Sequence, residues 1–333
     1  MRGILGVALC LLASLPVAAS DGSPKRPVAT YSIVARDTVT GEMGVAVQSH
    51  WFSVGPIVPW AQAGIGAVAT QSFVDPAYGP LGLELMRAGR SAEDALAALL
   101  SVDGDEAVRQ VAMVDARGGV AAHTGERAIY AAGHRVGSQF SVQANLMDRP
   151  TVWGAMAEAY ESASGDLAER LLRALEAAEA EGGDIRGRQS AAILVVSGTS
   201  TGRPWIDRLV DLRVEDHPHP VAELRRLVQL HRAYQQLNEG DEWVTRDDLD
   251  KAMEAYGRAT ALVPDEATNG EAPFWVGVTL AGADRVDEAI PYLRRAQALD
   301  PRWARLVARL PASGLLPADE ELIRRLVEGM KAP

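Results

Sequence analysis

The sequence is poor in cysteine and in basic residues, and each shortage excludes a class of site or partner. Its single cysteine, Cys10, lies within the first 20 residues. A chain that loses this segment has no cysteine, which excludes disulfides, thiolate metal sites and a cysteine nucleophile. Acidic residues outnumber lysine and arginine 44 to 33, so the net charge is −11 and the pI is near 5.1. Nucleic acid or an anionic membrane surface is therefore not the expected partner.

Long apolar runs are also missing beyond the start of the chain. Residues 1–20 combine Arg2 with an apolar run at 4–15 and end in small residues, which is the pattern of a secretory signal peptide. No later stretch approaches the roughly 20 apolar residues that a membrane span needs. We therefore expect an exported protein, secreted or periplasmic, with no membrane span after signal cleavage. Residues 21–29, DGSPKRPVA, are expected to form a short leader.

Motifs for metals and cofactors are scarce. His217 and His219 are separated by one proline and lack further ligands at zinc spacing. Residues 64–69, GIGAVA, resemble part of a dinucleotide fingerprint but do not open a helix. We expect no metal and no cofactor.

The remaining composition is that of a globular protein, with 47% hydrophobic and 23% charged residues over 333 positions, which suggests two domains. Residues 30–50 predict a hairpin, because residues 31–35 and 43–48 are rich in valine and isoleucine and flank a turn from Asp37 to Gly41. Neither strand alternates between polar and apolar residues, so both faces of this sheet are expected to be covered.

The order of elements along the chain predicts an α+β domain over residues 30–216. Strands are expected at 64–71, 109–115, 119–123, 138–141, 190–196 and 206–214, and helices at 78–88, 92–100 and, as a pair, 151–181. Strands and helices thus come in alternating groups, which is typical of an antiparallel layered sandwich and not of a doubly wound sheet.

Residues 217–333 are predicted to be helical and contain a repeat. Ala252, Tyr256, Ala259 and Pro264 recur 37 positions later as Ala289, Leu293, Ala296 and Pro301. This spacing resembles tetratricopeptide repeats. At most two units are present, because the first helix of the first copy is poorly defined around residues 236–243. We expect the repeats to pack on the first domain or to bind a protein partner.

Several separated motifs resemble one family, the domain of unknown function 1028. They are the hairpin with Gln48, the Gly55–Trp60 segment, Thr70-Gln71, Arg109-Gln110, His123-Thr124-Gly125, Gln143-Ala144-Asn145 and the run from Gly182 to Ala191. The resemblance covers residues 30–216, with one departure at Ala144, where glycine is expected. The family is similar to the N-terminal-nucleophile hydrolases, so the resemblance implies a four-layer αββα sandwich.

The resemblance also implies a chemistry for Thr30. In such enzymes the hydroxyl of the first residue attacks a carbonyl and its free amine is the general base. Signal cleavage alone would leave about ten residues before Thr30, so a second cut after Ala29 is required. The alternative is that Thr30 is a β-branched residue that opens a strand.

Other candidate site residues lie at strand ends and in loops. Gln48, Ser49 and His50 end the strand paired with that of Thr30, so the hairpin should bring them near it. The Gln48 carboxamide is a candidate for orienting substrate or donating to an oxyanion, and His50 is a candidate substrate-binding residue; the alternative is a solvated strand end. Asn145 is a second candidate donor. Gln71 and His123 are candidate substrate-binding residues, although a lone histidine is more often structural.

Asp184, Arg186 and Arg188 lie in a glycine-rich turn before a buried strand. Two guanidinium groups suit a substrate carboxylate, with Asp184 orienting one of them. A structural turn network is the competing interpretation.

The sequence therefore favours an amide-bond hydrolase that acts on a small molecule or peptide through Thr30. Two alternatives stay open: a non-catalytic ligand-binding module whose repeats recruit a partner, and a cell-envelope scaffold. Pairing of two copies through their sheets also stays open.

Overall fold

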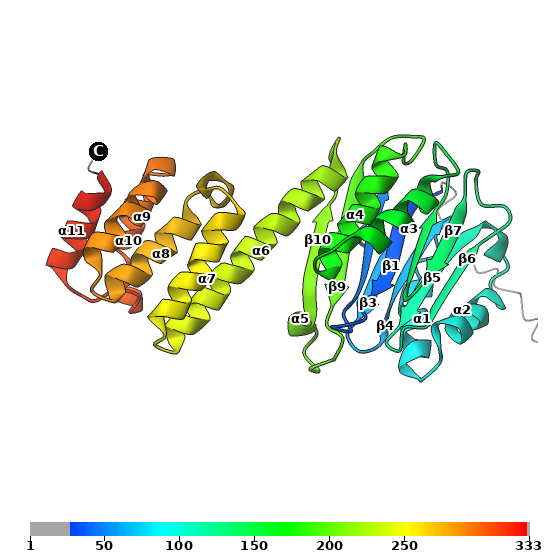
Figure 1. The fold of residues 1–333 in the computed structure, drawn as a ribbon, viewed down its shortest axis with the longest axis horizontal. Coiled ribbons are helices and arrows are strands. Elements are labelled where there is room, and N and C mark those ends of the chain that lie inside the picture. Colours follow the sequence, from blue (N-terminus) through cyan, green and yellow to red (C-terminus); the bar gives the residue numbers. More distant parts are fainter. Residues whose placement is uncertain (1–26, 332–333) are drawn as a thin grey trace, which may run out of the picture.

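The computed structural model describes residues 27–331, which form a layered body of sheets and helices followed by an array of helices (Figure 1). The predicted signal peptide, residues 1–20, and the first part of the leader, residues 21–26, lie outside the described residues. None of the helices in the described part combines the length and apolar character needed to cross a bilayer.

Two antiparallel sheets form the centre of the body. The six-stranded sheet has the spatial order β10 (Arg208–Val214), β9 (Ser190–Val196), β2 (Met43–Ser49), β1 (Thr30–Arg36), β8 (Phe140–Ala144) and β7 (Gly133–Gly137). The four-stranded sheet has the order β3 (Pro59–Gln62), β4 (Gly66–Ser72), β5 (Arg109–Asp115) and β6 (Val120–Thr124). The two sheets face each other, with β1 and β2 against β4 and β5.

Helices cover the outer face of each sheet. On the four-stranded sheet lie α1 (Tyr78–Arg87) and α2 (Ala92–Leu100); on the six-stranded sheet lie α3 (Val152–Ser162) and α4 (Leu167–Ala180). A short helix α5 (Pro204–Asp207) precedes β10. The layers run helix, sheet, sheet, helix, which confirms the predicted α+β body with antiparallel sheets.

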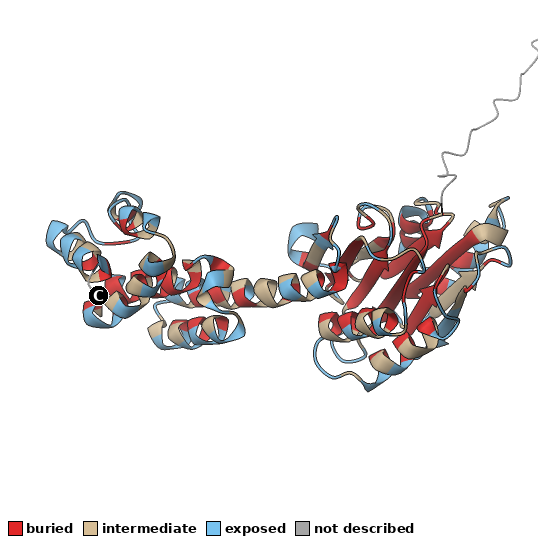
Figure 2. Ribbon diagram, turned by 90° about the horizontal axis from the view of Figure 1, so that it is seen from above, coloured by how far each residue is buried: buried red, intermediate tan, exposed pale blue. Residues whose placement is uncertain are grey.

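The layering explains why the first hairpin does not alternate between polar and apolar residues. On β1, Ile33 faces the core beneath α3 and α4, whereas Val34 faces the core between the sheets. On β2, Ala46 and Val45 divide in the same way. Both faces are therefore buried, as Figure 2 shows for the strands of the central layers.

The helical array begins with α6 (Pro220–Thr245), which leads away from the layered body (Figure 1). It continues as α7 (Leu249–Leu262), α8 (Glu271–Gly282), α9 (Val286–Leu299), α10 (Arg302–Val307) and α11 (Glu320–Lys331). The first turns of α6 place Val221, Leu224 and Val228 in the core beneath α4, whereas Leu237 belongs to the core of the array. One helix is thus shared between two cores.

The repeat predicted from the sequence marks the buried faces of α7 and α9. A further pair of positions at the same 37-residue spacing extends it into the preceding helices. A Cβ atom on Gly240 of α6 would lie 2.3 Å from the ring of Tyr256, and one on Gly277 of α8 would lie 2.5 Å from Leu293. Each pair of helices therefore packs through a glycine against a large side chain. The first helix of the first copy, poorly defined in the sequence, is the second half of α6.

Gly240→Ala is expected to lower the free energy of unfolding of the helical array by about 1–3 kcal/mol, because the new methyl group must displace the buried Tyr256 ring. Gly257→Ala on α7 is the matched control, since no atom lies within 4 Å of its added Cβ. That variant should instead be stabilised by up to about 1 kcal/mol. Urea unfolding followed by circular dichroism measures both, and equal effects would contradict the packing described.

Candidate active site

Thr30 begins β1 and is fully buried. Its hydroxyl donates to the carbonyl oxygen of Val28 at 2.7 Å and lies 3.2 Å from the hydroxyl of Ser49. Thr30 and Ser49 are paired across β1 and β2, so their side chains share one face of the sheet. This is the face toward the four-stranded sheet, because Val34 and Val47 of the same alternating series lie in the core between the sheets. The Thr30 hydroxyl therefore lies among polar groups at the end of the space between the sheets.

The residues before Thr30 are held by the end of β4. Val28 forms an isolated antiparallel β-bridge with Ser72. The Val28 amide donates to the Ser72 carbonyl at 2.6 Å, and the Ser72 amide donates back to the Val28 carbonyl at 3.0 Å. The last residues of the leader thus pair with the four-stranded sheet, while Thr30 belongs to the other sheet.

The carbonyl oxygen of Ala29, which precedes the Thr30 nitrogen, accepts two side-chain hydrogen bonds. The Ser49 hydroxyl donates at 2.5 Å and the Arg186 guanidinium at 3.0 Å. Arg186 also donates to the carbonyl oxygen of Pro27 at 3.3 Å. Two donors, one of them permanently charged, therefore polarise this carbonyl.

Asp184 orients the Arg186 side chain. The Asp184 carboxylate accepts from the guanidinium at 2.8 and 3.1 Å and from the backbone amide of Arg186 at 2.9 Å. The Asp184 carboxylate also accepts from the backbone amide of His50 at 3.1 Å. The Asp184 side chain is fully buried, and its ion pair is with the Arg186 guanidinium.

Amide groups from both sheets hold the carbonyl oxygen of Thr30. The backbone amide of Asn145 donates at 3.1 Å, the Gln71 carboxamide at 3.2 Å and the Asn145 carboxamide at 3.4 Å. The side-chain oxygen of Gln110 accepts from Gln71 at 2.7 Å and from Asn145 at 2.9 Å. Asn145, predicted as an oxyanion donor, therefore uses its carboxamide to position Thr30.

The network that includes Gln71 continues through residues that the sequence analysis did not select. Ser32 donates to the Gln71 side-chain oxygen at 2.6 Å and accepts from Gln143 at 2.6 Å, and Ser141 donates to Gln143 at 3.0 Å. All four are fully buried. A glutamine near the end of a buried strand, as in TQS and VQA, is the feature of the sequence that points to this network.

Gln48 does not join Thr30. Its partner across the hairpin is Tyr31, so the Gln48 side chain lies on the face toward α3 and α4, opposite to the Thr30 side chain. Among the described residues, neither amide atom of Gln48 has a hydrogen-bond partner, although the side chain is buried. Gln48, predicted to orient substrate or donate to an oxyanion, therefore lies away from the Thr30 hydroxyl, and Ser49, one residue further, lies beside it.

Two other predicted residues lie outside the Thr30 cluster. His123 on β6 contacts Glu106, with its Nε2 atom 2.9 Å from the Glu106 carbonyl oxygen and 3.3 Å from the carboxylate. Arg188 pairs with Glu179 of α4 at 2.8 Å and lies 3.4 Å from a ring nitrogen of His219. Of the three residues predicted in the turn, Arg186 contacts the leader, Asp184 contacts Arg186, and Arg188 contacts α4.

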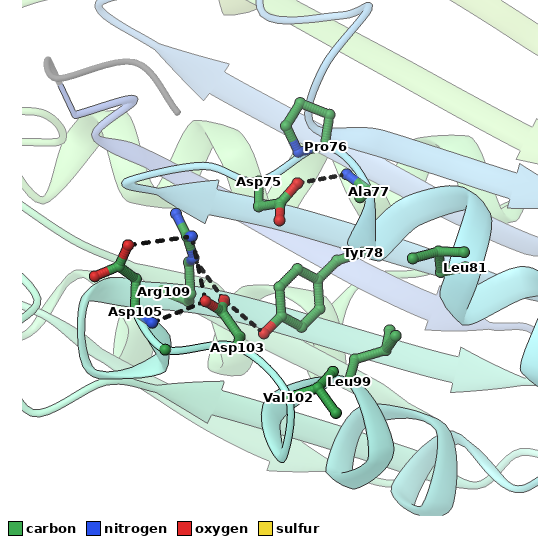
Figure 3. Close-up of a pocket in the computed structure, with 11 residues that line it drawn as sticks. Asp75, Pro76, Ala77, Tyr78, Leu81, Leu99, Val102, Asp103, Asp105 and Arg109 are labelled. Carbon is green, nitrogen blue, oxygen red and sulfur yellow. Dashed lines mark hydrogen bonds and ion pairs between the residues drawn. The ribbon is translucent and has the colours of Figure 1, made fainter. Parts of the chain in front are cut away.

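A separate cleft of about 550 Å³ lies on the outer side of the four-stranded sheet (Figure 3). Arg109 and Asp103 form an ion pair at 2.8 Å, and the Tyr78 hydroxyl donates to Asp103 at 2.9 Å. Burial raises the pKa of Tyr78, and the bond to Asp103 raises it further. Burial alone would also raise the pKa of Asp103, but hydrogen bonds from Arg109, the Asp105 amide and Tyr78 outweigh it, so the pKa lies below its usual value.

Asp103→Asn is expected to lower the free energy of unfolding by about 2 kcal/mol at pH 7, because the charged hydrogen bonds to Arg109 are lost. The folded pKa of Asp103 lies below the unfolded value of about 3.9, so its contribution is complete above that value. The contribution disappears as the pH falls through the folded pKa. Urea unfolding at decreasing pH should show a constant difference between the variant and the native chain above about pH 3.9, and a difference that narrows below it.

Asp105→Asn is the matched control for this pH dependence. The Asp105 side chain is 50% exposed and lies 4.0 Å from Arg109. Its replacement should change the stability by less than about 0.5 kcal/mol at every pH. A larger effect from Asp105 than from Asp103 would contradict the assignment.

Within residues 27–331, no three side chains of histidine, cysteine, aspartate or glutamate gather as metal ligands would. The described Thr30 cluster instead offers a buried hydroxyl, a polarised carbonyl and a charged donor. These are the groups that acyl transfer uses.

The chain matches the family of unknown function DUF1028 over residues 30–224. It belongs to the DUF1028 family. Among solved structures, the crystal structure of protein SPO2555 from Silicibacter pomeroyi, of the same family, is similar with 33% sequence identity and a TM-score of 0.54. That similarity covers 60% of this chain and 85% of the Silicibacter pomeroyi chain. The comparison with curated proteins finds no match.

The DUF1028 match begins at Thr30 and includes all the residues described around it except those of the leader. It ends at residue 224, within the part of α6 that packs on the layered body. The rest of α6 and the helices that follow it lie beyond the DUF1028 region.

Proposed function

We propose that this DUF1028 protein is an exported amide-bond hydrolase of the N-terminal-nucleophile type, in which Thr30 becomes the first residue. One observation carries the proposal: the Thr30 hydroxyl is buried among polar groups, and the carbonyl before it accepts from Ser49 and Arg186. The layer order of helix, sheet, sheet and helix supports assignment to the αββα sandwich of those enzymes.

The reaction begins with proton transfer. A free amine on Thr30 has an ordinary pKa of about 7.7–8.0, so near neutral pH part of it is unprotonated and accepts the hydroxyl proton. The hydroxyl oxygen attacks the substrate carbonyl carbon and forms a tetrahedral oxyanion. The protonated amine then gives its proton to the leaving nitrogen, and the C–N bond breaks. Water hydrolyses the resulting ester, which releases the acid and restores the hydroxyl.

Ser49 and Arg186 stabilise the developing oxyanion in this proposal, because both already donate to a carbonyl oxygen beside the Thr30 nitrogen. Asp184 keeps the guanidinium in place. Asn145 and Gln71 are positioning residues, since their amides fix the Thr30 carbonyl.

The mechanism requires hydrolysis of the peptide bond between Ala29 and Thr30. Intact-mass analysis of the exported protein tests this directly. The proposal predicts a chain that begins at Thr30. A mature chain that retains Ala29 would rule out the amine as the general base, because it would remain an amide.

A second candidate function is a non-catalytic binding module, and the burial of the leader favours it. Val28 and Ala29 are fully buried, and Val28 belongs to the core between the sheets. In a chain that keeps these residues, the leader is part of the core and Thr30 has a structural role. The same mass measurement separates the two candidates.

In either case we propose that the helical array is tetratricopeptide-like and binds a protein partner. A groove of about 680 Å³ lies between α6, α7 and α8. Its lining combines Trp275, Leu249 and Leu315 with the carboxylates Asp241 and Asp247. Apolar side chains with two acidic groups suit an apolar segment that carries positive charge.

A further inference from the structure

The leader residues Pro27–Ala29 are bound as an extended peptide would be bound by a receptor. The Val28 backbone exchanges two hydrogen bonds with Ser72, as a strand added to the edge of a sheet does. The carbonyl groups on either side accept from Arg186, and that of Ala29 also accepts from Ser49. These contacts recognise the backbone and do not depend on the leader's side chains.

The side chains of the same segment are buried in the protein. Val28 and Ala29 are both fully buried, and Val28 belongs to the core between the sheets, which also contains Val47, Val54 and Val74. An enclosed apolar site of this kind accepts a small branched side chain and rejects a charged one, because a buried charge without a partner is strongly unfavourable.

We propose that the groove occupied by Pro27–Ala29, here called the leader groove, is the acyl-side binding site of the protein. It takes an extended peptide whose last two residues are small and apolar, and the chain's own leader is its first occupant. This assignment rests on the proposed function and adds the substrate class: peptides or acyl-peptide amides cleaved after a small residue such as alanine.

The position of the leader relative to Thr30 supports this assignment. The Thr30 hydroxyl donates to the Val28 carbonyl, and the Ser49 hydroxyl, which donates to the Ala29 carbonyl, lies 3.2 Å from it. A substrate that replaces the leader places its own carbonyl between these donors. After hydrolysis, its carboxylate faces the guanidinium of Arg186, which favours binding of the free acid as well.

The test uses the full chain with Val28→Asp, which puts a charge in the enclosed site and so releases the leader in cis. If processing removes the leader, the mature chain of the variant is identical to the native mature chain, and its groove is open because the leader is gone. Calorimetry then measures the binding of acetyl-Pro-Val-Ala as the free acid. Acetyl-Pro-Asp-Ala and acetyl-Pro-Val-Phe are the matched control peptides.

We expect acetyl-Pro-Val-Ala to bind about tenfold to a hundredfold more tightly than acetyl-Pro-Asp-Ala, since burial of one valine side chain corresponds to that range. Arg186→Lys in the same background should weaken binding about tenfold. Equal binding of the peptides, or no binding, would overturn the proposal. If Val28→Asp does not fold, Val28→Gly is used in its place, because it weakens the binding of the leader in the groove without adding a charge. The same expectations apply to it.

Binding of a free acid needs no turnover, so the two proposals fail separately. If a chain without amidase activity binds the peptides selectively, the leader groove is supported as a binding site and the hydrolase proposal is wrong. If amidase activity depends on Thr30 but the peptides do not bind selectively, the hydrolase proposal stands and the assignment of the leader groove as the acyl-side site is wrong.

Discussion

Thr30→Ala is expected to lower amide hydrolysis by at least about 1,000-fold, because the variant lacks the only group that forms the acyl bond. The substrates are chromogenic peptide anilides with a small residue before the scissile bond, and the measurement is the initial rate of anilide release. In a chain that keeps the leader, the lost hydrogen bond to the Val28 carbonyl should cost only about 1 kcal/mol of stability. Loss of activity should therefore occur in a folded chain.

Thr30→Ser is the matched control for this prediction. Serine keeps the hydroxyl and the amine and removes only the methyl group, so this variant should retain activity well above that of Thr30→Ala. If Thr30→Ala remains as active as the native chain, the nucleophile lies elsewhere. If Thr30→Ser is as inactive as Thr30→Ala, the methyl group and not the hydroxyl is what matters.

Gln110→Leu is expected to have the largest effect on stability. The Gln110 carboxamide accepts from Gln71 and Asn145 and donates to the Ala144 carbonyl at 2.9 Å, all in a fully buried position. Leucine has a similar volume but cannot form these three hydrogen bonds. Each buried hydrogen bond contributes about 1 kcal/mol, so the free energy of unfolding should fall by roughly 3 kcal/mol.

The same substitution should also reduce activity, because Gln71 and Asn145 hold the Thr30 carbonyl and both depend on Gln110. Gln235→Leu is the matched control, since Gln235 is an exposed residue of α6. It should change neither stability nor activity by a measurable amount. Urea unfolding and anilide hydrolysis report the two effects, and a neutral Gln110→Leu would show that the amide network is not needed.

The layered body was predictable because its signals are local. Continuous apolar runs in β1 and β2 indicated a sheet covered on both faces, and the structure confirms this. The start of α2 is also set locally, since the Ser91 hydroxyl caps the helix by accepting from the Asp94 amide at 3.0 Å. By contrast, β3 is not among the predicted strands, and Pro59 opens it. Proline is tolerated there since β3 is an edge strand of its sheet.

The candidate site was only partly predictable, because it depends on the register of strands far apart in sequence. Gln48 and Ser49 are neighbours, yet only Ser49 shares a face with Thr30, which follows from the pairing of β1 with β2. That pairing could have been anticipated from the hairpin turn. The meeting of Gln71, Gln110 and Gln143 could not, because it requires two sheets to face each other in one particular alignment.

The most direct measurement is the capture of the acyl-enzyme. The exported protein is incubated with an acetyl-Pro-Val-Ala anilide, quenched in acid and digested, and the N-terminal peptide is analysed by mass spectrometry. The account predicts a peptide whose first residue is Thr30 and whose hydroxyl carries the acetyl-Pro-Val-Ala group as an ester. An acyl group on another residue, no acyl group at all, or a peptide in which Thr30 is still joined to Ala29 would contradict it.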